Sequence, residues 1–138
     1  MTLERKLPFF ANHQDILVVD DLPSLCFLLK DYLQSKGYKV HAATSATDAY
    51  DLLASRKFGL VIADLQLNAQ PGSNGMDVIG HVRKHSASTP IIAISGSASL
   101  GRLSQLAAVG VHAFLSKPFP LERLHQMILS VMPQPSLS

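Results

Sequence analysis

The 138-residue chain has one cysteine, no tryptophan and no uninterrupted apolar stretch as long as a membrane-spanning helix needs. A single cysteine, Cys26, excludes an internal disulfide and a thiolate metal cluster, and it is compatible with a reducing compartment. We expect Cys26 to fill part of the core. The apolar stretch that starts at Leu7 is too short for a secretory signal. We therefore expect a cytoplasmic protein without membrane insertion, unless the chain is cut from a larger protein.

Charge is also scarce in this sequence. Charged residues make up 16% of the chain and hydrophobic residues 47%, a balance typical of a compact folded protein rather than a disordered one. The formal net charge is only +2, and the Lys and Arg residues are scattered along the chain. We therefore expect no direct contact with nucleic acid. The length suits one domain with a substantial core.

Short apolar runs alternate with segments of helical spacing along most of the chain. This alternation is typical of an α/β protein in which βαβ units build a parallel sheet. Five such pairs can be counted, which predicts a doubly wound, five-stranded (βα)5 domain. The predicted strands lie near 15–20, 38–43, 59–63, 90–94 and 112–115.

The helices between these strands carry recognisable start and stop signals. The first helix is predicted to begin at Pro23 and to stop at Gly37. Its expected apolar face consists of Leu25, Leu28, Leu29, Tyr32 and Leu33. Ser45, with Asp48 three residues later, predicts the cap of the second helix. The fourth helix, near 98–109, has the weakest helical pattern.

The domain boundaries are predicted from changes in composition. Residues 1–14 are expected to form an N-terminal extension and residues 15–132 the folded domain. Residues 133–138 contain two prolines and are predicted to be a C-terminal tail or the start of a linker. Segment 65–75 is rich in Gly, Ser, Asn and Pro, which predicts an irregular loop.

Three carboxylates follow two of the predicted strands. Asp20 and Asp21 end the first apolar run, and Asp64 ends the third. Because the carboxyl ends of parallel strands open at one edge of the sheet, we expect these acids to lie together there. Such crowding of buried acids favours a bound cation. Ser95 and Lys117 follow the fourth and fifth runs and are expected at the same edge.

Each of these residue types has a chemical role in phosphoryl transfer. Carboxylate oxygens suit Mg²⁺, and an aspartate can act as a nucleophile that forms an acyl phosphate. Asp64 is the expected nucleophile because it stands alone on its strand, whereas Asp20 and Asp21 form the metal half. Ser95 would donate to a phosphate oxygen and Lys117 would pair with it.

With these motifs the sequence resembles the receiver domains of two-component response regulators. The resemblance rests on four stretches in the family's order and spacing: Val18-Val19-Asp20-Asp21, Ile62-Ala63-Asp64-Leu65, Ile94-Ser95-Gly96 and Phe114-Leu115-Ser116-Lys117-Pro118-Phe119. It covers residues 15–132, nearly the whole chain. Each stretch alone is a weak motif, but the four together on alternating strands are highly specific.

The resemblance implies a flavodoxin-like receiver domain with strand order 2-1-3-4-5. Such a domain is phosphorylated on Asp64 by a histidine kinase or a histidine phosphotransfer protein. Mg²⁺ or Mn²⁺ is the implied cofactor, with Asp21 as a direct ligand, Asp20 acting through water, and Asp64 and the backbone carbonyl of Gln66 completing the site. The protein would then be a signalling module and not an enzyme, with self-phosphorylation and self-dephosphorylation as its only chemistry.

The resemblance also implies a conformational switch. The family's switch positions fall on Ser95 and Phe114. Phosphorylation is expected to draw Ser95 inward, to let Phe114 turn and so to alter the face made by the fourth helix, the fifth strand and the fifth helix. This face is the family's usual partner surface, and a homodimer is one arrangement it allows. The peptide between Lys117 and Pro118 is expected to be cis.

One segment departs from the family pattern. Receivers commonly have Pro four residues after the phosphorylated aspartate and Gly eight residues after it. Here position 68 is Asn, and Gly75 comes later. The loop is therefore longer by about a turn, which affects loop geometry and partner fit rather than the acids.

Each residue also has a plainer explanation. The three acids could be helix caps or turn residues, and Lys117 could be a surface lysine. Ser95 could belong to an ordinary turn, and Phe114 could be a core residue. His81 and His85 lie four residues apart and could share a metal, but no third ligand stands nearby, so solvated histidines are preferred.

Two other functions stay open at this point. A haloacid-dehalogenase-like phosphatase also forms an aspartyl phosphate on a doubly wound sheet. That family needs a second acid two residues after a nucleophile on the first strand, and position 22 is Leu. A degenerate receiver that only binds a partner protein is the other alternative, against which the intact acids and Lys117 argue.

Overall fold

The computed structural model describes residues 15–67, 75–96 and 107–132. Within them, five parallel strands form one sheet in the order β2-β1-β3-β4-β5. The strands are β1 (Asp15–Val19), β2 (Lys39–Ala43), β3 (Leu60–Asp64), β4 (Ile91–Ser95) and β5 (Ala113–Ser116). The predicted strand positions, the doubly wound topology and the strand order are confirmed.

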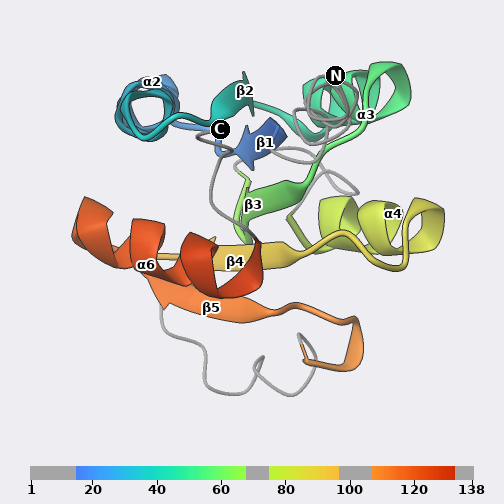
Figure 1. The fold of residues 1–138 in the computed structure, drawn as a ribbon. Helices are drawn as coiled ribbons and strands as arrows, with labels where there is room; N and C mark the ends of the chain where they lie inside the picture. The colour runs from blue at the N-terminus through green and yellow to red at the C-terminus, as the bar shows by residue number, and fades with distance from the viewer. Residues whose placement is uncertain (1–14, 68–74, 97–106, 133–138) are drawn as a thin grey trace, which may run out of the picture.

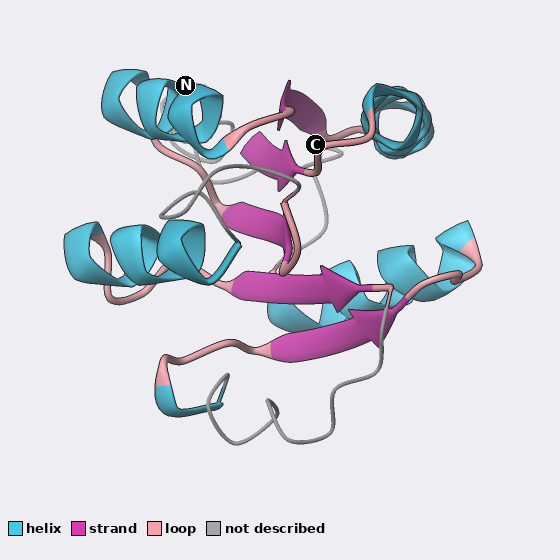
Figure 2. Cartoon of the chain, turned by 180° about the vertical axis from the view of Figure 1, so that it is seen from behind, coloured by secondary structure: helices cyan, strands magenta, loops and turns pink. Residues whose placement is uncertain are grey.

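Helices cover both faces of the sheet. Helices α2 (Pro23–Ser35) and α6 (Leu121–Val131) lie on one face, and α3 (Ala46–Ser55) and α4 (Gly75–His85) lie on the other (Figure 1). The view from behind shows the same arrangement, with the strands between two layers of helices (Figure 2). Most of the helix predicted near 98–109 lies outside the described residues. No helix in the described part of the chain combines the length and the apolar character needed to cross a membrane.

The core follows from this layering. Every residue of β1, β3 and β4 is buried, because helices shield both faces of the central strands. Alternate strand residues therefore enter two separate apolar clusters. Leu17 and Val61 pack beneath α3 and α4, whereas Ile16 and Ile62 pack beneath α2 and α6.

Helix boundaries match the local signals. Pro23 occupies the first turn of α2, and Gly37 adopts a φ of 99°, which favours glycine, just after the helix ends. The Ser45 side chain accepts a 3.1 Å hydrogen bond from the Asp48 N–H at the start of α3. The predicted cap is therefore confirmed.

The predicted apolar face of α2 was wrong at one position. Leu28 is 47% exposed, whereas Cys26, Leu29 and Leu33 are the buried residues of this helix. Successive helical residues are rotated by about 100°, so Leu28 points away from the stripe that contains Leu29. The expectation that Cys26 fills the core is confirmed by its exposure of 4%.

Candidate functional site

The three acids converge at the carboxyl edge of the sheet. Asp20 directly follows β1, and Asp64 is the last residue of the neighbouring strand β3. The register pairs Val19 with Ala63, which places the next residue of each strand side by side. One carboxylate oxygen from each of Asp20, Asp21 and Asp64 lies within 4.8 Å of the others, close enough to share a metal ion.

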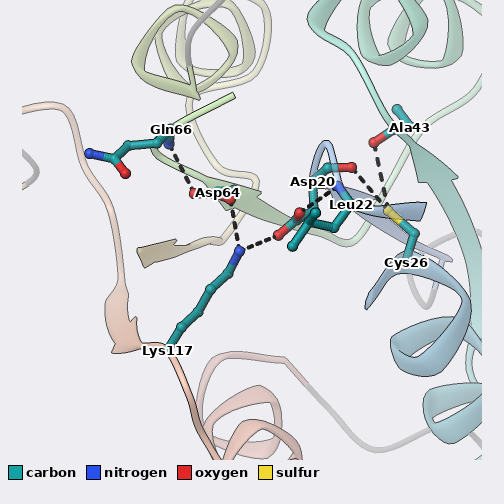
Figure 3. A network of polar contacts seen from close by, with 7 residues as sticks. All are labelled: Asp20, Leu22, Cys26, Ala43, Asp64, Gln66 and Lys117. Carbon is teal, nitrogen blue, oxygen red and sulfur yellow. Dashed lines mark hydrogen bonds and ion pairs between the residues drawn. The ribbon is translucent and has the colours of Figure 1, made fainter. Parts of the chain in front are cut away.

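Lys117 reaches the same edge from β5. Its backbone N–H donates a 2.8 Å hydrogen bond to the Ser95 carbonyl, and the following peptide bond is cis. The Lys117 Nζ donates to Asp20 Oδ2 at 2.8 Å and to Asp64 Oδ2 at 2.9 Å (Figure 3). The ammonium thus bridges two carboxylates that come from different strands.

Backbone N–H groups orient the other oxygen of each carboxylate. Asp20 Oδ1 accepts a 2.9 Å hydrogen bond from the Leu22 N–H, and Asp64 Oδ1 accepts one of the same length from the Gln66 N–H (Figure 3). Both side chains are almost fully buried, and Asp21 is half-buried. The carboxylates are therefore oriented before any ligand arrives.

Burial sets the ionisation of this cluster. It raises the pKa of Asp20, and the nearby charge of Asp64 adds to the rise, while Lys117 and the Leu22 N–H oppose it. Burial acts to lower the pKa of Lys117, but its hydrogen bonds to two carboxylates outweigh that effect and the pKa is raised. Lys117 is therefore held as an ammonium. Its charge does not fully offset the effect of burial on Asp20, so the pKa of Asp20 stays raised.

The remaining predicted residues lie close to this cluster. Ser95 is the buried last residue of β4, and its strand partner on β5 is Ser116, directly before Lys117. Phe114 lies on β5 opposite Ala93 and is half-buried against the core beneath α3 and α4. These positions suit the predicted roles, and the switch itself stays a prediction.

The structure also bears on the capping alternative for the acids. The residue that caps the start of α2 is Leu22, and it makes no side-chain capping bond. The Asp20 carboxylate instead accepts from Leu22 and from Lys117. Asp20 is therefore held at the sheet edge and does not cap the helix.

Two supporting residues were not predicted from the sequence. The Cys26 Sγ donates a 3.2 Å hydrogen bond to the Asp20 carbonyl, so the thiol supports the backbone of the site (Figure 3). Gly75, the first residue of α4, packs so tightly that a Cβ there would lie 1.8 Å from the Asp64 carbonyl oxygen. The sequence signals for Gly75 are its place at the end of the predicted loop and the glycine that the family has after the phosphorylated aspartate.

Comparisons with known proteins identify the class of protein that has this fold and acidic edge. The family model described as "Response regulator receiver domain" matches residues 16–129. The chain therefore belongs to the response regulator receiver domain family.

Curated relatives carry the same domain within longer proteins. The chain is 29% identical to the response regulator protein PilR of Pseudomonas aeruginosa, over 88% of this chain and 26% of PilR. It is 28% identical to the signal transduction histidine-protein kinase BarA of Escherichia coli K12, over 89% of this chain and 13% of BarA. The chain thus spans only a small part of these relatives.

Solved structures agree with the fold at nearly full length. A CheY-like response regulator receiver domain protein from Methanospirillum hungatei JF-1 has a TM-score of 0.79 and 25% identity, covering 85% of this chain and 91% of that one. Vibrio cholerae chemotaxis protein CheY4 has a TM-score of 0.78 and 28% identity, covering 86% and 98%.

Proposed function

We propose that this receiver domain is a phosphoacceptor in a two-component phosphorelay, and that Asp64 takes a phosphoryl group from a phosphohistidine. The donor would be a histidine kinase or a histidine phosphotransfer protein. The observation that carries this proposal is the Lys117 ammonium shared between the Asp20 and Asp64 carboxylates, beside a third acid, at the edge of a receiver fold.

In the proposed step, an Asp64 carboxylate oxygen attacks the phosphorus of the phosphohistidine. The new O–P bond forms as the P–N bond breaks, and the imidazole leaves with the electron pair and takes up a proton. Lys117 already lies 2.9 Å from Asp64 and would pair with an oxygen of the transferred group. Ser95, buried at the end of the adjacent strand, would donate its hydroxyl hydrogen to another.

The donor set fits Mg²⁺ or Mn²⁺. Asp20, Asp21 and Asp64 offer three hard oxygen ligands within 4.8 Å of one another, and the Gln66 backbone carbonyl is the proposed fourth protein ligand. A bound dication would neutralise the charge that accumulates between the carboxylate and the incoming anion. Within this proposal Asp21 is a direct ligand and Asp20 acts through water.

The proposed output is a change of surface rather than a chemical product. Phosphorylated Asp64 would draw in Ser95 and let Phe114 turn, which would alter the surface that includes β5 and α6. Slow self-hydrolysis would reset the domain, so the protein is a signalling module and not an enzyme with an external substrate. We place this module in the cytoplasm, with a homodimer as one form of the output.

The test is phosphorylation by small donors, followed by intact mass. Acetyl phosphate and phosphoramidate are each added with Mg²⁺, because phosphoramidate has the P–N bond of a phosphohistidine. We expect one phosphate-sized gain for the native chain, no gain after chelation and none for Asp64→Asn. Asp51→Asn changes an exposed acid on α3 and should still gain the phosphate.

The result also separates the alternatives. A gain that persists in Asp64→Asn would place the nucleophile elsewhere. If the folded native chain gains nothing from either donor with Mg²⁺ present, the domain is a degenerate receiver that only binds a partner.

A further inference from the structure

A cavity of about 750 Å³ lies at the opposite edge of the sheet from the acids. It is lined by the ends of α3 and α4 and by the segments that lead from them into β3 and β4. The two helices lie on the same face of the sheet (Figure 1). Its volume is within the range of about 300–1,000 Å³ that small-molecule sites occupy. The proposed phosphorylation chemistry uses none of its residues.

The inner wall of this cavity is apolar and aromatic. Phe58 and Val82 are buried and form part of the lining. The rings of Tyr50, His81 and His85 follow one another, with centroids 4.5 Å apart for the first pair and 4.3 Å for the second. The three rings pack against one another and so form a continuous aromatic wall of the cavity, which a flat ring can contact.

The rim of the cavity is basic. Arg56 and Lys57 line it and both are exposed, and among the described residues that line it there is no Asp or Glu. Arg56 is partly neutralised by Asp15, because its Nη1 lies 3.5 Å from Asp15 Oδ2, and the same atom is held 3.0 Å from His41 Nε2. Lys57 therefore supplies most of the fixed positive charge that a ligand would meet.

We propose that this cavity binds a small organic anion in which an aromatic ring carries a phosphate or carboxylate group. The ring packs along Tyr50, His81 and His85, and the anionic group faces Lys57 and Arg56. An exclusively apolar ligand would leave the basic rim unused, and a bare inorganic anion would leave the aromatic row exposed. The combination of the two surfaces selects the aromatic anion.

Protonation of His81 adds positive charge to this site. Burial lowers the pKa of His81, and the neighbouring His85 and Lys84 lower it further. The groups that face His81 are Tyr50 of α3 and, on its own helix, Lys84 and His85, while Asp77 acts on Tyr50. An anion beside His81 favours the imidazolium, so anion binding takes up protons and strengthens as the pH falls.

The test uses the full chain without divalent cations and follows backbone amide and histidine ring resonances by NMR. The probes are 2-naphthoate, 2-naphthyl phosphate and the neutral analogue 2-naphthalenemethanol. We expect both anions to shift resonances of cavity residues. We also expect each anion to bind about fivefold more tightly than the neutral probe, because one solvent-screened charge contact contributes up to about fivefold in affinity. A preference between the two anions identifies the anionic group of the ligand.

Matched variants locate the binding. Lys57→Gln should weaken anion binding roughly threefold to fivefold, and His81→Asn with His85→Gln roughly tenfold, with the loss greatest at low pH. Lys36→Gln, just after α2, and His125→Asn, on α6, remove the same residue types away from the cavity and should leave affinity unchanged.

Three results would overturn the proposal. The neutral probe could bind as tightly as the anions, the shifts could cluster around Asp20 and Asp64, or no cavity resonance could move at saturating probe. Lys57 is exposed, so Lys57→Gln is expected to fold. This variant therefore still tests the proposal if the double histidine variant fails to fold.

Discussion

Burial of the Asp20 carboxylate carries a cost in free energy. Asp20 has no exposed surface, and burial raises its pKa despite the hydrogen bond from Lys117. An acid with a raised folded-state pKa binds protons more tightly in the folded chain than in the unfolded one. Its contribution to stability is therefore present at low pH and is lost as the pH rises through the folded pKa. Above that pKa the ionised Asp20 lowers stability.

We predict that Asp20→Asn raises the free energy of unfolding at neutral pH by about 1 kcal/mol when divalent cations are absent. Asparagine keeps the size of the side chain and removes the charge that burial penalises. Urea denaturation with a chelator measures this, with Asp51→Asn as the control. Mg²⁺ should stabilise the native chain more than Asp20→Asn. A clear loss of stability in the metal-free variant would show that the pair with Lys117 outweighs the cost of burial.

Cys26 is expected to be chemically inert while the chain is folded. Burial raises its pKa to about 11, and its side chain donates to the Asp20 carbonyl. At about pH 8 roughly one thiol in a thousand would be ionised, compared with about a quarter of free thiols. We predict that iodoacetamide leaves the folded chain unmodified and alkylates Cys26 in urea. Equal rates in both conditions would contradict the packing seen around Asp20.

At the scale of elements, the start of α4 is built against the end of β3. The Gly75 N–H donates to the Leu65 carbonyl at 3.2 Å, and a Cβ on Gly75 would overlap the Asp64 carbonyl. Gly80, five residues later in the same helix, is exposed, and apart from the backbone of its own helix no atom lies within 4 Å of its would-be Cβ. Close packing therefore requires glycine at position 75, whereas no contact requires glycine at position 80.

We predict that Gly75→Ala lowers the free energy of unfolding by about 3 kcal/mol or more, because backbone atoms must move to admit the methyl group. It should also slow the proposed phosphorylation of Asp64. Gly80→Ala should raise stability by roughly 0.5–1 kcal/mol through helix propensity alone. Paired urea denaturation curves check both values. Similar stability for the two variants would mean that α4 does not press on β3.

The elements that the sequence predicted well depend on local signals. Strand positions follow from buried apolar runs. The start of α3 follows from Ser45, whose side chain accepts a hydrogen bond from the Asp48 N–H three residues later. One misjudged residue and one missed residue depend on contacts between elements. The exposure of Leu28 depends on how α2 sits on the sheet, and the need for glycine at position 75 depends on the path of the chain back to Asp64.

At the scale of the whole molecule, the two edges of the sheet differed in predictability. The acidic edge could be predicted because parallel strands bring their carboxyl ends together. The topology alone therefore predicts that Asp20, Asp64 and Lys117 lie close to one another. The sharing of one ammonium between two carboxylates depends on side-chain positions that the topology alone does not fix. The cavity at the other edge was not predicted, because it is formed by the ends of two helices and the segments after them, for which the sequence carries no motif.

Arg83 holds that second edge together. Its guanidinium donates to five backbone carbonyls, those of Ser86 (3.0 Å), Ala87 (2.8 Å), Thr89 (3.1 Å), Val109 (3.1 Å) and Gly110 (2.9 Å). These carbonyls belong to the segment before β4 and to the turn that precedes β5. One planar side chain with five N–H donors thus joins α4 to the entry of two strands, a geometry that the three donors of lysine cannot reproduce.

We predict that Arg83→Met lowers the free energy of unfolding by about 3 kcal/mol, because partly buried carbonyls lose charge-assisted hydrogen bonds. Arg83→Lys should recover less than half of this loss. Lys84→Met changes the exposed neighbour on the same helix and should stay within about 0.5 kcal/mol of the native chain. Urea denaturation monitored by circular dichroism measures all three. If Arg83→Met is as stable as the native chain, water satisfies these carbonyls and the entry of β4 and β5 does not depend on Arg83.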